Sequence, residues 1–319
     1  MSTALRLAAG VDPGTHVADW LGAPELARLV EAFGGPEPAP NAPAAVTLAR
    51  LDAFSERWNF RAGRERNEAA DAHFTGAQRS AIADAARALG QLDLELPEAR
   101  EWDVIVVLGG LVRACISRPV VTAALLAEDR LSTREVLGIG ALRGINDGER
   151  ALAARIPDII PPGEVPRDEL DAMTLGFRHA FGLDGVFDET GENHASIDTS
   201  WRERRYRTHV ERTYRIIAAP APRPGGRATT SDVLAWFGRR DAVAAGTRIL
   251  LITTEIYRHY FLVDAVRTLG LCRGAIVDCL GISPAQADPR LAMEFPHSDR
   301  LQEIRSSIRA LRALADALG

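Results

Sequence analysis

The sequence predicts an α/β protein with a Rossmann-like, mostly parallel sheet flanked by helices and an N-terminal helical extension. Short, continuous apolar runs, typical of strands buried on both faces, occur at residues 103–108, 135–142, 248–253 and 274–279. Helical patterns alternate with these runs, which implies right-handed crossovers and parallel pairing. We therefore expect a helical region over residues 1–100 and a Rossmann-like domain over 101–319 that ends in an amphipathic helix.

Helical periodicity predicts the helices of the protein. In the first hundred residues, Pro24 opens a helical segment that the proline-rich run at 34–43 ends, and further helices are expected at 44–60 and 76–91. Between the strands, helices are expected at 118–129, 148–156, 167–181, 230–245 and 256–269. The glycine- and proline-rich stretch at 220–226 is expected to be a loop.

Composition argues against several classes of binding partner and of chemistry. The net charge of -5 argues against broad binding to nucleic acid or to an anionic membrane. The chain contains no lysine, so a Schiff-base lysine and a P-loop lysine are excluded, and anions must be held by arginine or backbone amides. The three cysteines form no C-x-x-C pair, and neither a signal peptide nor a membrane-length apolar run is apparent. We therefore expect a cytoplasmic protein.

A glycine pair, Gly109-Gly110, follows the first expected strand, and Arg113 and Arg118 come next. In open parallel sheets, ligands bind beyond the carboxyl ends of the strands, where helix N-termini offer unpaired amides. Glycine lets a backbone approach a ligand closely, and arginine can neutralise an anion. A tight turn with solvated arginines gives the same pattern, so both interpretations stay open. The pattern is neither G-x-G-x-x-G nor a Walker loop, which disfavours a dinucleotide.

The polar stretch at 188–199 is a second candidate. Asp188, Glu189 and Glu192 are candidate catalytic bases, and Asn193 is a candidate ligand-binding residue. A solvated loop is the alternative interpretation. The stretch has no H-E-x-x-H or comparable spacing, so we expect no metal site.

A third candidate lies where the strand at 248–253 ends. Thr253 and Thr254 are candidate ligand-binding residues there, although Thr254 could serve only as a helix N-cap. Arg258 and His259 open the next helix on the same expected edge, and we favour a ligand-binding role for Arg258 and a catalytic role for His259. We expect Gly109, Glu189 and Thr254 to share one cleft.

The segment around Trp58 and Phe60 is dense in arginine. Arg61 and Arg64, together with Arg66, are expected to point toward the ligand or toward a partner chain. Packing of the two rings onto the sheet domain is the simpler explanation for the aromatic residues.

These motifs together resemble the YdcF/SanA-like proteins over about residues 103–280. The shared order is a strand ending in Gly-Gly, a loop with Glu and Asn, and a strand ending in Thr before a helix with His and Arg. The resemblance implies a Rossmann-like sheet and, from some family members, binding of S-adenosylmethionine. The envelope role of other members is set aside, because their N-terminal anchor is not seen here. The matching residues are Gly109, Gly110, Glu189, Glu192, Asn193, Thr253, Thr254, Arg258 and His259.

Three functions are compatible with these patterns. The first is an enzyme of bacterial specialised metabolism that acts on a small anionic metabolite by group transfer, by hydrolysis, or by a displacement or cyclisation that expels phosphate or sulfate. The second is a protein that binds S-adenosylmethionine or a nucleotide, although the usual glycine-rich methyltransferase loop is missing. The third is a non-catalytic subunit of a larger complex. Assembly as a homo- or hetero-oligomer stays open.

Overall fold

The computed structural model describes residues 12–36, 42–60, 73–92, 96–183, 187–194, 199–206, 212–226 and 228–319. The chain divides into two compact units. The helical unit comprises Met1–Asp93, Glu255–Arg267 and Glu294–Gly319, and the sheet unit comprises Leu94–Thr254 and Thr268–Met293. The expected division at residue 100 therefore differs from the structure, because two later segments, including the C-terminal helix, belong to the helical unit.

The sheet unit is built on a seven-stranded sheet in the part of the chain that is described. Its strands are β1 (Glu101–Leu108), β2 (Ser132–Ala141), β3 (Phe187–Glu192), β4 (Trp201–Tyr206), β5 (Thr213–Ala219), β6 (Arg248–Thr254) and β7 (Ile276–Ile282). The order across the sheet is β3-β4-β5-β2-β1-β6-β7. The five strands from β5 to β7 are parallel, whereas β4 runs antiparallel to both β5 and β3. The expected α/β fold with a mostly parallel sheet is confirmed.

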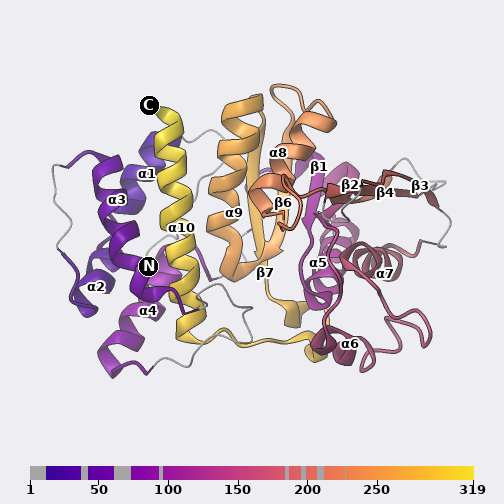
Figure 1. Ribbon diagram of the computed structural model, residues 1–319, viewed down its shortest axis with the longest axis horizontal. Coiled ribbons are helices and arrows are strands. Elements are labelled where there is room, and N and C mark those ends of the chain that lie inside the picture. Colours follow the sequence, from indigo (N-terminus) through magenta and orange to yellow (C-terminus); the bar gives the residue numbers. More distant parts are fainter. Residues whose placement is uncertain are drawn as a thin grey trace. The chain divides into compact units, whose positions relative to one another are not determined.

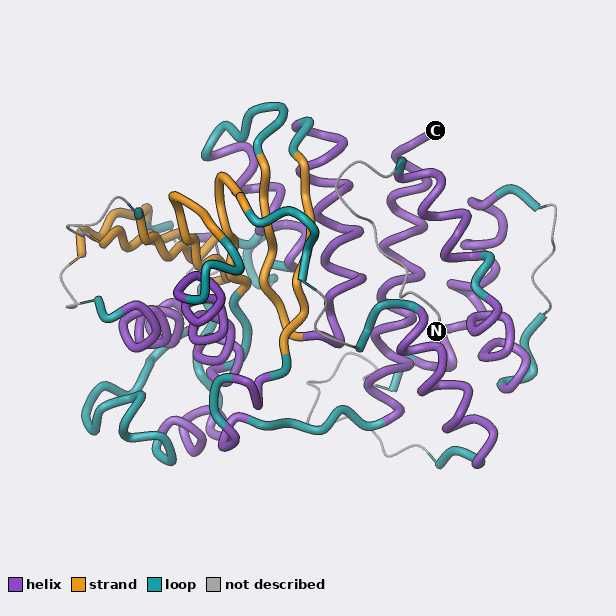
Figure 2. The backbone as a smooth tube through the Cα atoms, turned by 180° about the vertical axis from the view of Figure 1, so that it is seen from behind, coloured by secondary structure: helices purple, strands orange, loops and turns teal. Residues whose placement is uncertain are grey.

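Helices cover both faces of this sheet (Figures 1 and 2). The covering helices are α5 (Val112–Ala127), α7 (Glu169–Phe181) and α8 (Thr230–Arg240), and α6 (Asp147–Ala153) packs on α5. The α5 helix packs on β1, β6 and α7, while α7 and α8 both pack on β2 and β5. Because α7 and α8 contact the same two strands without packing on each other, they lie on opposite faces.

Two sequence expectations for the sheet unit are wrong. The polar stretch expected to be a loop begins as β3, and β4 and β5 were not predicted. Strands β3 and β4 are rich in charged residues, and β5 has only a short apolar run, at 216–219, after Arg215. The helix expected to start at 118 begins at Val112, with Pro119 in its interior. Proline favours the first turn of a helix, but α5 begins directly after the glycine pair and holds Pro119 within its length.

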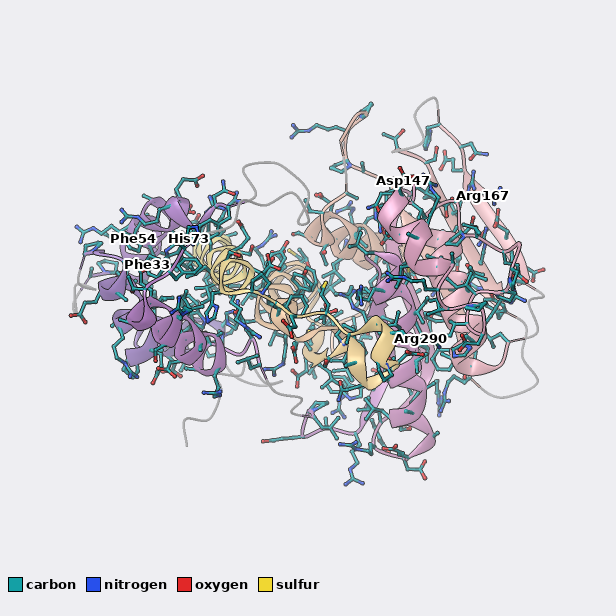
Figure 3. All side chains as sticks on the ribbon, turned by 90° about the horizontal axis from the view of Figure 1, so that it is seen from below. Phe33, Phe54, His73, Asp147, Arg167 and Arg290 are labelled. Carbon is teal, nitrogen blue, oxygen red and sulfur yellow. The ribbon has the colours of Figure 1, made fainter. Side chains whose placement is uncertain are left out.

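The helical unit contains α1 (Pro13–Leu21), α2 (Pro24–Ala32), α3 (Ala44–Ser55), α4 (Gly76–Ala88), α9 (Arg258–Ala265) and α10 (His297–Leu318). The α10 helix packs on α1, α3, α4 and α9. It has buried Leu301, Ile304, Ile308 and Leu311 at helical spacing. Buried Trp58 is contacted edge-on by both Phe33 and Phe54, at ring-centroid distances of 5.7 and 5.4 Å, and Figure 3 labels these two phenylalanines.

Within the described residues, no helix is both long and apolar enough to cross a membrane.

A buried network of charges joins the sheet to α8. The guanidinium of Arg215 on β5 contacts Glu203 of β4 at 2.6 Å, Glu135 of β2 at 2.7 Å and Asp241 at 2.7 Å. Arg240 of α8 also binds Glu203. Burial alone would raise the pKa of Glu203, but hydrogen bonds and attraction from Arg215 and Arg240 outweigh it and lower the pKa. The network therefore stays ionised although Glu203 is only 3% exposed.

We expect Arg215→Met to lower the free energy of unfolding by about 3–5 kcal/mol, because it leaves buried carboxylates without their main cation. Arg205→Met is the matched control, since Arg205 also pairs with Glu203 but its side chain is 57% exposed. That variant should lose less than about 1 kcal/mol. Urea denaturation of both variants measures the difference, and equal losses would contradict the structural role of Arg215.

Candidate functional site

The carboxyl edge of β1 and β6 is the topological switch point of the sheet. From β1 the chain continues to β2 on one side, and it later returns as β6 on the other side. A crevice at such a point is where open α/β sheets bind ligands. Gly109-Gly110 follow β1 and Thr253-Thr254 end β6, so the sequence correctly identified residues at this edge.

Arg118 joins the ends of these two strands. Its NH1 group donates to the carbonyl oxygens of Leu108 and Gly109, at 2.6 and 2.5 Å, and its NH2 group donates to the hydroxyl of Thr254 at 3.0 Å. The side chain is almost completely buried, with the residue 3% exposed. Arg118 therefore holds the edge together, and its guanidinium is occupied by protein groups at the position where the sequence had suggested an anion clamp.

The glycine pair is required by the protein itself. A Cβ atom on Gly109 would lie 2.2 Å from a carboxylate oxygen of Glu169 and 2.9 Å from the sulfur of Met173. Gly110 has a φ of 153°, a conformation that residues with a side chain rarely adopt. The two glycines thus make room for Glu169 and permit the turn into α5, so an alanine at either position would test the architecture as well as ligand binding.

A buried ionic cluster, made by Arg143, Glu149 and Glu169, lies beside the glycine pair. Arg143 follows β2, and its guanidinium donates to Glu169 at 2.7 Å, to both oxygens of Glu149 at 2.9 Å, and to the carbonyl of Gly110 at 2.5 Å. Glu149 also accepts the amide hydrogen of Val112 at 2.9 Å. The cluster therefore ties the ends of β1 and β2 to the starts of α5, α6 and α7.

Electrostatics keeps this ionic cluster charged. Burial disfavours the guanidinium of Arg143, but its hydrogen bonds to Glu149 and its attraction to Glu169 outweigh burial and raise its pKa. Burial would likewise raise the pKa of Glu149, but hydrogen bonds from Arg143 and from the amides of Asn146 and Val112 lower it. Sequence reasoning missed these three residues. The signal was the Asn146-x-x-Glu149 capping box just after β2.

Backbone amides without an acceptor among the described residues lie at the same edge of the sheet. Among the described residues, no acceptor binds the backbone N–H groups of Gly110, Leu111 and Arg113 at the start of α5. The side chain of Leu111 is 40% exposed beside them. Sixteen residues of α5 align their peptide dipoles behind these amides, which favours an anion at this end.

Arg113 binds carbonyl groups of the protein, and Thr253 is buried. The guanidinium of Arg113 donates to the carbonyl oxygens of Leu291 and Ala292, which ties the loop before residue 294 to α5. The hydroxyl of Thr253 is fully buried and has no hydrogen-bond partner among the described residues.

The expected acid–base residues do not join the switch point. Asp188, Glu189 and Glu192 lie exposed on β3, and exposed Asn193 follows it. Four strand spacings separate β3 from β1, or about 19 Å, so Glu189 does not share a cleft with Gly109. Instead, Glu189 accepts a hydrogen bond from Arg204 at 2.6 Å. The cause is the pair β4 and β5, which the sequence did not predict and which displaces β3 to the edge.

Arg258 and His259 begin α9 in the helical unit, and both are buried there. The ring of His259 contacts His16 and Trp20 of α1. Arg61, Arg64 and Arg66 lie outside the described residues.

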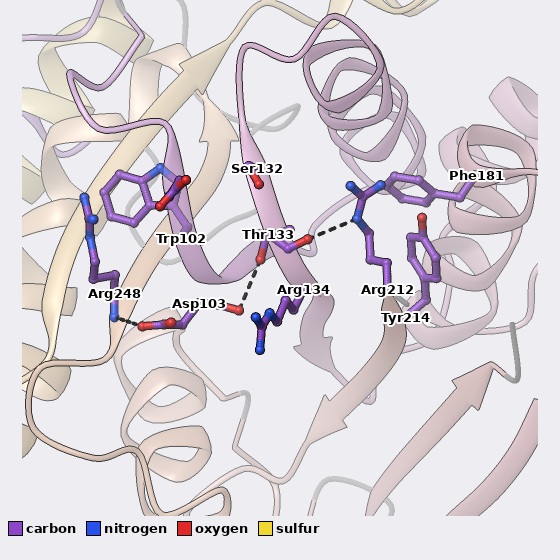
Figure 4. A pocket seen from close by; sticks show the side chains of 10 residues that line it. Trp102, Asp103, Ser132, Thr133, Arg134, Phe181, Arg212, Tyr214 and Arg248 are labelled. Atoms are coloured by element: carbon purple, nitrogen blue, oxygen red, sulfur yellow. Dashed lines mark hydrogen bonds between the residues drawn. The ribbon is translucent and has the colours of Figure 1, made fainter. Parts of the chain in front are cut away.

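The opposite edge of the sheet carries an open hollow of about 1010 Å³ at the amino ends of the strands. Figure 4 shows Trp102, Thr133, Arg134, Arg212 and Arg248 around it. The guanidinium of Arg248 lies 5.4 Å from the Trp102 ring, and Arg212 donates to the carbonyl of Thr133 at 3.2 Å. Ligands of parallel sheets bind at the carboxyl edge, so we assign the candidate site to the switch point in spite of the size of this hollow.

The described residues give little support to a metal site or to Cys115 as a catalytic residue. No group of three or more His, Cys, Asp or Glu side chains there is arranged to hold a metal ion. Cys115 is buried behind the glycine pair and donates to the carbonyl of Gly110 at 3.3 Å. Burial and the nearby Glu169 raise the pKa of its thiol, which makes Cys115 a poor nucleophile.

Comparison with known proteins finds mycobacterial proteins of similar sequence. Residues 7–90 match the family described as the Rv3785 N-terminal domain, a region that includes α1 to α4. The uncharacterized proteins Rv3785 of Mycobacterium tuberculosis (strain ATCC 25618 / H37Rv) and Mb3814 of Mycobacterium bovis (strain ATCC BAA-935 / AF2122/97) are each 28% identical to it, over 94% of this chain and 88% of their own. No solved structure matches. The YdcF/SanA-like resemblance stays a prediction.

We expect Gly109→Ala to lower the free energy of unfolding by about 1–3 kcal/mol, because the added methyl group must displace the Glu169 carboxylate. Gly144→Ala is the control, since a Cβ atom there meets nothing within 4 Å and the backbone needs no positive φ. Chemical denaturation should leave the control within about 0.5 kcal/mol of the parent. If both variants were equally stable, Glu169 would not be fixed over Gly109.

Proposed function

We propose that the sheet unit is an enzyme that binds a small anionic metabolite at the carboxyl ends of β1 and β6. The observation that carries the proposal is the set of unpaired amides of Gly110, Leu111 and Arg113 at the start of α5, next to the topological switch point. In a chain without lysine, backbone amides are a natural means of holding a phosphate, sulfate or carboxylate.

In this proposal, the ionic cluster of Arg143, Glu149 and Glu169 provides the general base. One oxygen of Glu169 lies over Gly109 while the other accepts from Arg143, so the carboxylate is fixed beside the amides. Glu169 is accordingly our candidate general base, in place of the acidic residues of β3. The amides would stabilise negative charge that develops on the bound group, in a group transfer, a hydrolysis or a displacement that expels the anion. Fixed donors of this kind are among the largest contributors to catalysis.

Binding of a nucleotide or S-adenosylmethionine is the second candidate. The parallel strands run in the order β5-β2-β1-β6-β7, which is the order of the first five strands of dinucleotide-binding folds. We also propose that the protein acts in the cytoplasm, because its three cysteines are all free.

Leu111→Pro is the sharpest test of the amides. Leu111 has a φ of -64°, which is the angle that proline imposes, so the exchange removes one N–H group and keeps the backbone. Loss of a hydrogen bond to a charged group costs about 1.5–3 kcal/mol, or roughly 10- to 150-fold in affinity. We expect this loss for phosphate, sulfate or AMP in isothermal titration calorimetry, with an unchanged melting temperature.

Leu111→Ala is the matched control, since it trims the same side chain but keeps the N–H group. It should bind the anions nearly as tightly as the parent. Equal affinity of the parent and Leu111→Pro for every anion would overturn the proposal. S-adenosylmethionine is titrated in parallel, and binding of that compound alone would favour the second candidate.

A further inference from the structure

Two buried histidines meet inside the helical unit. His16 of α1 and His259 of α9 are 1% and 2% exposed, and their Nε2 atoms lie 3.0 Å apart. The indole of Trp20 stacks on His259 with ring centroids 5.6 Å apart and an interplanar angle of 18°. This contact joins α1, which lies in the family-matched N-terminal region, to a helix more than 230 residues later in the chain.

The contact needs one Nε2 atom without a hydrogen. One Nε2 atom must carry the hydrogen and the other must offer its lone pair, so a proton added to the accepting Nε2 atom would place two N–H groups against each other. A proton added to Nδ1 of the donating ring would keep this hydrogen bond but would bury a positive charge near Arg258. The charged groups that act on the pair are Asp19 of α1, which favours protonation of His16, and Arg258 of α9, which opposes protonation of both rings. The Nδ1 atom of His259 is buried without a partner among the described residues, so no acceptor is in place for an added proton.

We propose that the hydrogen bond between His16 and His259 is a pH-sensitive latch that holds α1 against α9 at neutral pH and releases α1 on acidification. Histidine is suited to this role because its ordinary pKa lies near neutrality, and protonation of buried histidines is a recurrent switch. The inference is independent of the proposed function, because every residue in it belongs to the helical unit.

The sign of the effect follows from the direction of the pKa shifts. Burial, with the charge of Arg258, lowers the pKa of His16 from 6.5 to about 4, and burial also lowers that of His259. The open state therefore takes up protons more readily than the closed state. The stability of the closed state is complete above about pH 6.5 and is lost as the pH falls toward 4. From His16 alone, the opening equilibrium should rise roughly 30-fold between pH 7.5 and pH 5.

Amide hydrogen exchange of the full chain measures this opening. Peptides from α1 should lose protection roughly 30-fold at pH 5 relative to pH 7.5, after correction for intrinsic exchange rates. Peptides from α7 of the sheet unit serve as the internal reference and should change little. Unchanged protection of α1 over this range would overturn the latch.

The double variant His16→Gln/His259→Gln separates the latch from general acid sensitivity. Glutamine can donate and accept a hydrogen bond but does not titrate, so the pH dependence of α1 protection should disappear. His297→Gln is the control in the same unit and should keep the pH dependence of α1. Persistence of the full pH dependence in the double variant would refute the proposal.

Nuclear magnetic resonance titration of the parent protein needs no variant. The His16 ring should stay neutral down to about pH 4 in the closed state. A His16 ring that titrates near its ordinary pKa of 6.5 while α1 remains protected would also refute the latch.

Discussion

The buried guanidinium of Arg118 ties together the two strand ends that define the switch point. It binds the last carbonyls of β1 and the terminal hydroxyl of β6, so the strands cannot separate without exposing an unpaired buried charge. The turn into α5 and the position of the unpaired amides both depend on this junction. Its guanidinium is bound by protein groups, so in the function we propose the anion is held by backbone amides and not by Arg118.

A second buried arginine, Arg143, connects further strands and helices at the same edge of the sheet. Arg143 lies between Glu149 and Glu169, and together they fix the starts of three helices against two strands. Buried ion pairs add little net stability, because desolvation offsets most of their attraction. Their value here is geometric: Arg143 holds the Glu169 carboxylate by a hydrogen bond at 2.7 Å, and a side chain at position 109 would collide with that carboxylate. A site held in this way needs little rearrangement when charge develops on a bound group.

The helical unit differs from the sheet unit in the groups that it buries. Its helices bury apolar stripes and large rings, and its interior holds two histidines whose pKa burial lowers, beside buried charged residues such as Asp264 and Glu303. The sheet unit keeps its buried groups charged by pairing arginine with glutamate. In the latch we propose, the histidine pair responds to mild acid, whereas the arginine–glutamate pairs change only when carboxylates are protonated at much lower pH.

The sequence alone determined the α/β class and the edge at which the candidate site lies. Continuous apolar runs marked β1, β2, β6 and β7, and glycine and threonine marked where β1 and β6 end, because these signals are local. The tertiary structure alone decided which side chains meet there. Strands β4 and β5, which the sequence did not predict, place Glu189 about 19 Å from Gly109, while Glu169, 60 residues beyond Gly109, lies over it. Long-range ion pairs and strand order bring such residues together, and neither leaves a periodic pattern in the chain.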